Sequence, residues 1–244
     1  MNILVVAAHP DDETIAMGGT LKKLSKDHFI KIMFLADGVS GRRKPGFKTI
    51  PKWETTEKDK KLMLKEIEER KTHAKNALKH LGIKEMSFFG APSEELSEIP
   101  MLKITKLVEE ELSKKKYNVI FTHHYNDLSN DHKIAFEASI TAARPLETST
   151  VSTILSFEVI SSPDWNKPYK FRPNLFIDIS SEIKTKLKAL SEYKHEIRKF
   201  PHPRSNETTE AVAKRWGSLN GFTHAEAFEI VTSRMTDLKR MSLF

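Results

Sequence analysis

Two clusters of histidine and aspartate side chains lie far apart in the sequence and are of the residue types that hold a metal ion. His9, Asp11 and Asp12 directly follow an apolar run, and Asp131 and His132 lie downstream of another. Two imidazoles and one carboxylate that leave one position open form a known catalytic arrangement for zinc. Such an ion lowers the pKa of a bound water to about 7, and a spare carboxylate nearby can act as general base. These residues therefore indicate metal-assisted hydrolysis.

A simpler interpretation of the first cluster is that Asp11 and Asp12 only cap a helix, which is a common reason for aspartate at such a place. Capping needs one acidic residue, however, and it does not need His9. The chain contains no cysteine, so a metal site can have only nitrogen and oxygen ligands. No G-x-G-x-x-G motif follows the first apolar run, and no G-x-S-x-G motif is present, so a dinucleotide site and a serine nucleophile are poorly supported.

Apolar runs and helical periodicity alternate along the chain and predict the elements that position these clusters. Strands are predicted over residues 3–8, 31–36, 86–89, 118–122, 154–157 and 175–179, and residues 227–231 fit a closing strand. Helices are predicted over residues 14–24, 57–81, 102–112, 134–143, 182–199 and 207–216. This alternation favours the α/β class, as a Rossmann-like three-layer α/β/α sandwich with a mostly parallel sheet. Both clusters then lie at the carboxyl ends of strands, where open α/β sheets bind ligands.

The loop after the second predicted strand is long for a compact domain. It runs from Asp37 to about Thr56, and loops of this length often cover or form a binding site. Arg42 and Arg43 within it have two interpretations of equal weight. They hold an anionic or hydroxyl-rich ligand, or they belong to a solvated basic loop.

The composition is that of a polar globular protein. The 244 residues can bury a substantial core and no linker divides them, so one domain spanning residues 1–244 is predicted. The net charge is +7, but much of the basic excess lies in mixed-charge runs that are typical of solvated helix faces rather than of a nucleic-acid surface. No apolar run approaches the roughly 20 residues that cross a bilayer, and no basic leader precedes the first strand. We therefore expect a cytoplasmic protein without nucleic-acid partners or a membrane span.

Two motifs resemble those of a known family. Ala8-His9-Pro10-Asp11-Asp12-Glu13 followed by Gly18-Gly19, together with the later Asn130-Asp131-His132, resembles the LmbE-like/PIG-L family of zinc-dependent N-acetylglucosaminyl deacetylases. Residues 37–40 and 201–205 are also similar to bacterial members of this family. The resemblance extends over most of the chain.

The resemblance implies a Zn²⁺ ion and a role for four residues of the motifs. His9, Asp12 and His132 would be the zinc ligands, and Asp11 would be the general base that takes a proton from the activated water. The reaction would be hydrolysis of an acetamide, releasing acetate and a free amino sugar. Members of the family are often homo-oligomers, so the resemblance also allows a homo-oligomer here.

The sequence departs from the family in two places. Many members carry a histidine three residues before the last ligand, as the partner of the oxyanion, and this chain has Ser129 there. His123, His124 and His202 are the alternatives, of which His124 is favoured as the catalytic group. The second departure is His73, which stands where family members commonly carry glutamate.

Substrate contacts are predicted for Arg42, His202 and Arg204, with Glu158, Arg144 and Trp165 as weaker candidates. The function predicted from these residues is zinc-dependent removal of an N-acetyl group from a small amino-sugar substrate. Within the same class, the alternative is an amidase that acts on a larger N-acyl or sugar conjugate. From a different class, the alternative is a basic binding module for nucleotides or nucleic acid without catalysis.

Overall fold

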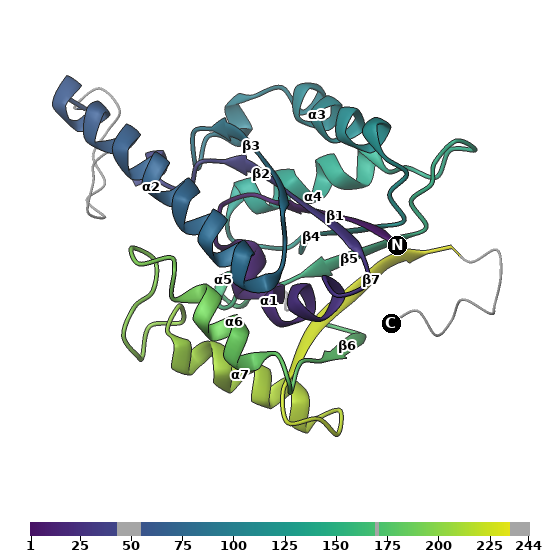
Figure 1. Cartoon of the computed structure of the whole chain (residues 1–244). Helices are drawn as coiled ribbons and strands as arrows, with labels where there is room; N and C mark the ends of the chain where they lie inside the picture. Colours follow the sequence, from purple (N-terminus) through teal and green to yellow (C-terminus); the bar gives the residue numbers. More distant parts are fainter. Residues whose placement is uncertain (43–54, 169–170, 235–244) are drawn as a thin grey trace.

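The computed structural model of the chain describes residues 1–42, 55–168 and 171–234, and Figure 1 shows how their elements are arranged. In this part of the chain, seven strands form one sheet in the order β3-β2-β1-β4-β5-β7-β6. The strands are β1 (Asn2–Ala7), β2 (Phe29–Ala36), β3 (Glu85–Ala91), β4 (Val119–His123), β5 (Thr153–Phe157), β6 (Leu175–Asp178) and β7 (Ala225–Ser233). The helices are α1 (Asp12–Leu24), α2 (Glu57–Leu81), α3 (Met101–Lys114), α4 (Asn130–Ala142), α5 (Ser162–Trp165), α6 (Ile183–Leu190) and α7 (Asn206–Ser218).

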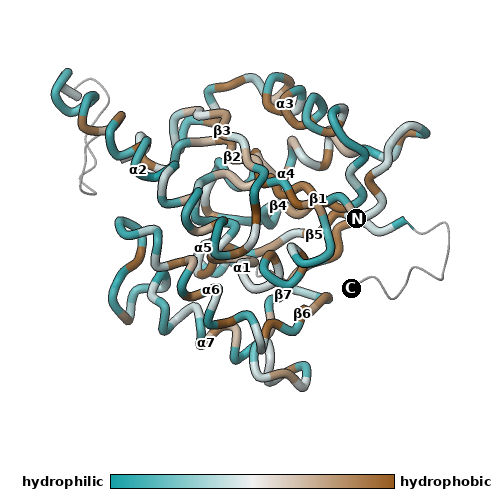
Figure 2. The backbone as a smooth tube through the Cα atoms, in the orientation of Figure 1, coloured by the Kyte–Doolittle hydropathy of each residue, from teal (hydrophilic) through white to brown (hydrophobic). Residues whose placement is uncertain are grey.

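Helices cover both faces of the sheet because successive side chains of each strand point in opposite directions. On β1, Ile3 and Val5 pack in one apolar core with residues of α1, α2 and α6. Leu4 and Val6 pack in a second core with residues of α3 and α4. Figure 2 shows hydrophobic backbone concentrated in the central strands, between the two helical layers. The predicted three-layer α/β/α sandwich is confirmed.

The order of the strands places a ligand-binding crevice beside β1. β3, β2, β1, β4 and β5 are parallel, whereas β7 pairs antiparallel with β5 and with β6. The chain builds β2 and β3 on one side of β1 and then crosses to place β4 on the other side. In open α/β sheets, ligands bind at the carboxyl ends of the strands where the order reverses in this way. Both histidine–aspartate clusters follow the two strands at this point.

The helix boundaries follow the sequence pattern with two exceptions. The capping box of Thr56 and Asp59 begins α2, and Gly82 at φ 82° ends it, as its predicted position requires. However, α4 begins at Asn130 rather than at residue 134, so Asp131 and His132 lie in its first turn. The helix predicted over 182–199 was too long, because α6 ends at Leu190 and residues 191–201 form a series of turns.

The Gly18-Gly19 pair of the first motif lies where α1 is broken. Met17 has non-helical angles (φ −140°, ψ 24°), and the helix restarts after it. The buried carboxylate of Glu226 accepts the backbone N–H groups of Gly19 and Thr20 at 2.9 and 2.6 Å. A Cβ atom at Gly19 would lie 2.8 Å from the side chain of Ile179, so only glycine allows this close approach.

Two predictions concern parts of the chain that the structure describes little or not at all. Residues 43–54 of the loop, including Arg43, lie outside the described residues, and Arg42 is described only as the last backbone position of the short helical turn η1 (Ser40–Arg42).

No helix among the described residues is long and apolar enough to span a membrane. The single-domain organisation and the cytoplasmic location stay predictions.

Candidate active site

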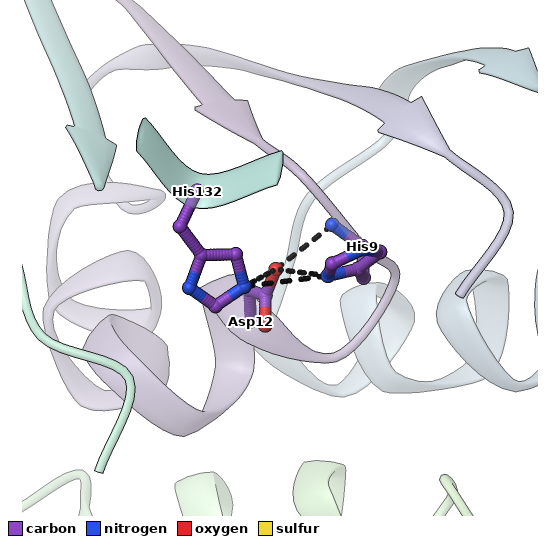
Figure 3. A group of neighbouring side chains, drawn as sticks. All are labelled: His9, Asp12 and His132. Carbon is purple, nitrogen blue, oxygen red and sulfur yellow. Dashed lines mark hydrogen bonds and ion pairs between the residues drawn. The ribbon is translucent and has the colours of Figure 1, made fainter. Parts of the chain in front are cut away.

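Three side chains from the two clusters converge on one point (Figure 3). Oδ2 of Asp12 lies 3.3 Å from Nδ1 of His9 and 3.3 Å from Nε2 of His132. The same two imidazole nitrogens lie 3.3 Å from each other. The three atoms therefore form a nearly equilateral triangle, and all three side chains are buried.

Each of these side chains is placed by the end of a secondary-structure element. His9 follows the carboxyl end of β1, Asp12 begins α1, and His132 lies in the first turn of α4. The backbone N–H of His9 donates to Oδ2 of Asp12 at 2.8 Å, which closes the turn between β1 and α1. The helix starts bring these polar groups to the sheet edge, where the α1 dipole also favours a carboxylate.

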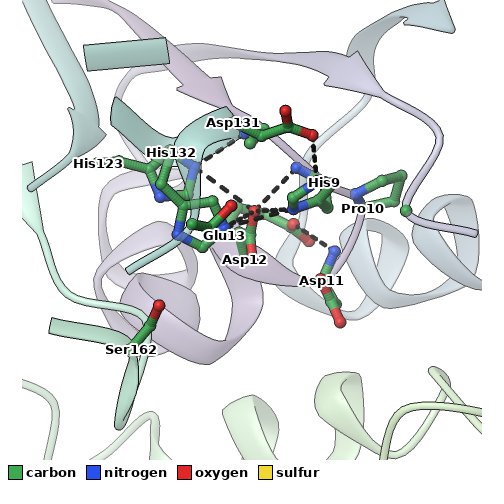
Figure 4. A network of polar contacts seen from close by, with 12 residues as sticks. His9, Pro10, Asp11, Asp12, Glu13, His123, Asp131, His132 and Ser162 are labelled. Atoms are coloured by element: carbon green, nitrogen blue, oxygen red, sulfur yellow. Dashed lines mark hydrogen bonds and ion pairs between the residues drawn. The ribbon is translucent and has the colours of Figure 1, made fainter. Parts of the chain in front are cut away.

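The outward nitrogen of each histidine faces a carboxylate, and Figure 4 shows the pair of His9 and Asp131. Nε2 of His9 lies 3.0 Å from Oδ2 of Asp131, and Nδ1 of His132 lies 3.0 Å from Oδ2 of Asp127. A proton on the outward nitrogen of each ring, facing its carboxylate, leaves the inward nitrogens, Nδ1 of His9 and Nε2 of His132, free as ligands. Histidine ligands of metals are usually oriented by a carboxylate in this way.

The charges around the triangle favour a cation. Burial alone would lower the pKa of His9, but the hydrogen bonds to Asp12 and Asp131 raise that pKa well above its usual range. Burial likewise opposes a charge on His132, yet Asp12 and Asp127 raise the pKa of His132 to about 9. In the absence of a metal, the raised pKa values therefore favour protonation of both imidazoles. Metal binding displaces such protons from the ligands.

The residues present fit a zinc ion. Ligand bonds of 2.0–2.2 Å in a tetrahedral site place the ligand atoms about 3.3–3.6 Å apart, which matches the edges of the triangle. Within the described structure, Oδ1 of Asp12 is buried and has no hydrogen-bond partner. His123 lies behind the triangle, and its Nε2 accepts the backbone N–H of Ala8 at 2.8 Å, so this nitrogen is not available to an ion. His9, Asp12 and His132 thus form one group that could hold a metal. Among the described residues, two further groups offer ligand atoms close to one another: His123, Asp127 and His132, and His9, Glu94 and Asp131.

Asp11 lies beside the triangle in a strained backbone conformation. It occupies the N-cap position of α1 with φ 139°, and its side chain makes no capping hydrogen bond, so the helix-capping interpretation is wrong for this residue. Its backbone N–H donates to Oε2 of Glu13 at 3.1 Å. Oε1 of Glu13 accepts the hydroxyls of Thr14 at 2.6 Å and of Tyr193 at 2.7 Å. Glu13, which the sequence left without a role, therefore fixes the backbone of Asp11.

Two arginines hold the carboxylate of Asp11. Its Oδ2 lies 3.3 Å from Nη1 of Arg70 and 3.1 Å from Nη1 of Arg204. Glu196 pairs with both arginines, so the four side chains form a compact charge network. Burial raises the pKa of Asp11 and the two guanidinium groups oppose this effect, with a net pKa of about 6.

A hollow of about 230 Å³ opens onto this site. Its lining brings together the two histidines proposed as ligands, the proposed base and the charge network. The lining residues are His9, Asp11, Gly38, Val39, Gly41, Arg70, Ser93, Glu94, Ser129, His132, Ser162, Glu196 and Arg204. Arg204 therefore lies where it can touch a substrate. His202 lines an adjoining hollow.

His124 does not line either hollow. It is buried, its Nε2 lies 3.0 Å from Oε2 of Glu229 on β7, and its ring packs edge-on against Phe171. The structure therefore does not bring His124 to the site, in contrast to the sequence prediction. The preceding His123 stacks on His132 with ring centroids 4.0 Å apart. Consecutive residues at the end of a strand point to opposite sides, so one of the two histidines had to face away.

The weaker candidates are spread over the molecule. Arg144 is exposed and pairs with Glu109 at 2.8 Å. Glu158 accepts a hydrogen bond from Nε1 of Trp216 at 3.3 Å. Neither Arg144 nor Glu158 lines the hollow at the site. His73 packs against His195, whereas Arg70, one turn earlier on α2, reaches the site.

Five residues of the site were missed from the sequence as functional groups: Arg70, Asp127, Glu196 and Tyr193, and Asp131 in its role as the partner of His9. Arg70, Tyr193 and Glu196 lie in a helix and in turns remote from both motifs, so the sequence offered no signal for them. Asp127 and Asp131 carried a signal, because acidic residues close to a histidine ligand often orient it.

The fold and this site together define a class, the α/β proteins in which side chains that could bind a metal ion meet at the carboxyl edge of a mostly parallel sheet. The model of the family "GlcNAc-PI de-N-acetylase" (PIG-L) matches residues 4–143, which is more than half of the chain. The chain belongs to this family. A comparison with curated proteins gave no match.

Solved structures of the same fold cover nearly the whole chain. N,N'-diacetylchitobiose deacetylase from Pyrococcus horikoshii has a TM-score of 0.72 at 20% identity, covering 95% of this chain and 84% of its own. The conserved protein TT1542 from Thermus thermophilus has a TM-score of 0.70 at 21% identity, covering 96% of both chains. The 4-carboxy-2-hydroxymuconate hydratase GalB from Pseudomonas putida has a TM-score of 0.70 at 20% identity, covering 97% of this chain and 98% of its own.

At these identities the neighbours show the fold, and the hydratase among them illustrates that fold alone does not fix activity. Family membership classifies the chain as a hydrolytic N-deacetylase. The prediction of an enzyme is therefore confirmed, and the alternative of a binding module without catalysis is wrong.

Proposed function

We propose that the protein removes the N-acetyl group from an amino-sugar substrate, with Zn²⁺ held by His9, Asp12 and His132 and with Asp11 as general base. The family description names an N-acetylglucosaminyl lipid as substrate, and one structural neighbour acts on diacetylchitobiose. Both are N-acetylated amino sugars, which supports this substrate class. Another neighbour was solved as the zinc-inhibited form of a teicoplanin deacetylase, so zinc binds to a protein of this fold.

The observation that carries the proposal is the free oxygen of Asp11. Its Oδ2 is held by Arg70 and Arg204, whereas no described residue is hydrogen-bonded to its buried Oδ1. Asp11 also lines the same hollow as His9 and His132. A fixed carboxylate with one unused acceptor oxygen beside a metal site is suited to take a proton from water.

The reaction follows from this arrangement. A zinc ion in the site would polarise the acetyl carbonyl and lower the pKa of the attacking water. Oδ1 of Asp11 accepts a proton from that water, while the oxygen of the water adds to the carbonyl carbon. As the C–N bond breaks, Asp11 returns this proton to the nitrogen, so that acetate and the free amine leave and the carboxylate of Asp11 is restored. Arg70 and Arg204 keep Asp11 oriented throughout.

His202 replaces His124 as the proposed hydrogen-bond donor to the oxyanion. Nδ1 of His202 accepts the backbone N–H of Arg204 at 3.0 Å, so the proton of the neutral ring is on Nε2. His202 borders the hollow next to the site and is exposed, which allows its ring to reach a bound substrate. Charge that develops on the oxyanion is stabilised by such a donor.

The test is acetate release in the presence of zinc, together with metal content. Asp11→Asn is expected to bind zinc like the wild type but to lose acetate release by at least about a hundredfold, because it removes the base and spares the ligands. His132→Ala is expected to lose zinc. Asp27→Asn, on the exposed turn after α1, is the control and is expected to keep both properties.

Normal turnover by Asp11→Asn would overturn the role of the base, and full zinc occupancy of His132→Ala would overturn the ligand set. A screen over N-acetylated sugars and larger N-acyl conjugates separates the proposed deacetylase from the amidase alternative. The amidase alternative requires turnover of the large conjugates alone.

A further inference from the structure

A second hollow of about 340 Å³ adjoins the hollow at the metal site. Glu94, Ser129, Ser162 and Arg204 line both, so the two are continuous. Small-molecule sites usually measure about 300–1,000 Å³, and the hollow at the metal site, with about 230 Å³, is smaller than this range. The binding site as a whole therefore extends into the second hollow, of which the proposed chemistry uses only His202 and Arg204.

Trp165 provides a flat apolar wall in the second hollow. Its side chain is 60% exposed, although it lines the hollow. A tryptophan that serves only the core would be covered by other side chains. Exposed aromatic rings that border a binding site offer a large contact area to a flat ligand group at little entropic cost.

Trp165 is also fixed relative to the proposed metal ligands. It lies on the one-turn helix α5, whose first residue Ser162 donates to Oδ1 of Asp127. Nδ2 of the following Asn166 donates to the backbone oxygen of Asp127 at 3.1 Å. Oδ2 of Asp127 faces His132, so one residue anchors both the aromatic wall and a metal ligand. Figure 4 shows Ser162 beside this cluster of side chains.

The polar groups of the second hollow favour an uncharged ligand. Glu94 contributes an exposed carboxylate that can accept hydrogen bonds from hydroxyl groups. The guanidinium of Arg204 is already paired with Asp11 and Glu196. Burial, followed by the charges of Arg198 and Arg204, lowers the pKa of His202, which is therefore neutral at pH 7. Among the described residues of this hollow, no cation is left to pair with a phosphate.

We propose that the second hollow is a subsite for a second, uncharged sugar ring of the substrate, which packs on Trp165 while Glu94 accepts its hydroxyl groups. This inference rests on the proposed deacetylation. It predicts that the enzyme prefers an N-acetylated disaccharide over the corresponding monosaccharide.

The experiment compares kcat/KM for N-acetylglucosamine, N,N'-diacetylchitobiose and UDP-N-acetylglucosamine with the zinc-loaded enzyme. We expect the disaccharide to be preferred over the monosaccharide by about three- to tenfold, which is the range for a favourable aromatic contact. In Trp165→Ala this ratio is expected to approach one, through a higher KM for the disaccharide. Trp165→Phe is expected to retain part of it. Phe222→Ala removes an exposed aromatic ring that lines neither hollow, so it should keep the wild-type ratio.

Two results would overturn the subsite: an unchanged ratio in Trp165→Ala, or a preference for the nucleotide sugar that depends on Trp165. Circular dichroism of the variants checks that they are folded. Turnover of the monosaccharide by the wild type distinguishes a failure of the proposed subsite from a failure of the proposed deacetylation. If that turnover is present, a failed ratio test rejects only the subsite, and if no N-acetylated sugar is cleaved, the proposed deacetylation itself fails.

Discussion

The phenol of Tyr193 donates a 2.7 Å hydrogen bond to Oε1 of Glu13, and thereby connects the turns after α6 to the motif after β1. The other oxygen of Glu13 accepts the backbone N–H of Asp11, whose φ of 139° is costly for a residue with a side chain. The pair therefore holds the proposed base in a conformation that the local sequence would not adopt by itself.

Tyr193→Phe tests this relationship. Without the phenol, Glu13 loses one of its partners and Asp11 is held less firmly, so we expect kcat to fall by about tenfold with zinc content unchanged. Tyr117→Phe is a matched control, because the buried phenol of Tyr117 donates to Glu111 at the same distance of 2.7 Å but away from the site. Both variants are expected to lose about 1–2 kcal/mol of unfolding free energy. An equal effect of both variants on kcat would contradict the positioning role.

Asp127→Asn is expected to weaken zinc binding by about 10- to 100-fold. The new amide would donate to Nδ1 of His132, so the neutral ring would carry its proton on Nε2, the nitrogen that points to the metal site. The retained Oδ1 still accepts the backbone N–H of Ser129, which preserves the local turn. Titration with a competing chelator measures the change, and Asp178→Asn on β6 is the control. Wild-type affinity in Asp127→Asn would show that this carboxylate does not set the tautomer.

The pH dependence of kcat/KM is expected to report Asp11. Its pKa of about 6 means that activity falls as the pH drops below about 6, because the protonated carboxyl cannot act as base. A cation bound beside Asp11 would lower the pKa of Asp11 and move this fall in activity to a lower pH. Arg204→Met removes one of the two charges that hold the pKa of Asp11 down, so the acid limb should move to higher pH. Arg144→Met, on an exposed surface pair, should leave the profile in place. An identical acid limb in Arg204→Met and the wild type would argue against Asp11 as the titrating base.

Glu158 gives a prediction for stability. Burial, and to a smaller extent Asp164, raise the pKa of Glu158 to about 7. Between its ordinary pKa of 4.5 and this value the folded state binds more protons than the unfolded state, so its contribution to stability falls as the pH rises. Glu158→Gln should therefore increase the free energy of unfolding by about 1–3 kcal/mol at pH 8 and by little at pH 4. Urea unfolding at the two pH values measures this, with the exposed Glu147→Gln as control. An equal increase in the free energy of unfolding at both pH values would contradict the raised pKa of Glu158.

The sequence by itself determined the fold class and the centre of the site. Apolar runs that end in polar clusters placed His9, Asp12 and His132 at strand ends, and parallel strands that share an edge had to bring these ends together. The length of α2 followed from its periodicity and from Gly82, because these signals are local.

The tertiary structure decided everything that depends on direction and on distant packing. Periodicity could not tell which of His123 and His124 faces the site, because alternation along a strand fixes only that the two side chains point to opposite sides. The early end of α6 was also hidden, since the turns that carry Tyr193 and Glu196 are held by contacts with Glu13 and Arg70 rather than by local preference. Motifs fix the atoms that could bind a metal, whereas the residues that hold the base come from remote segments and meet only in the packed fold.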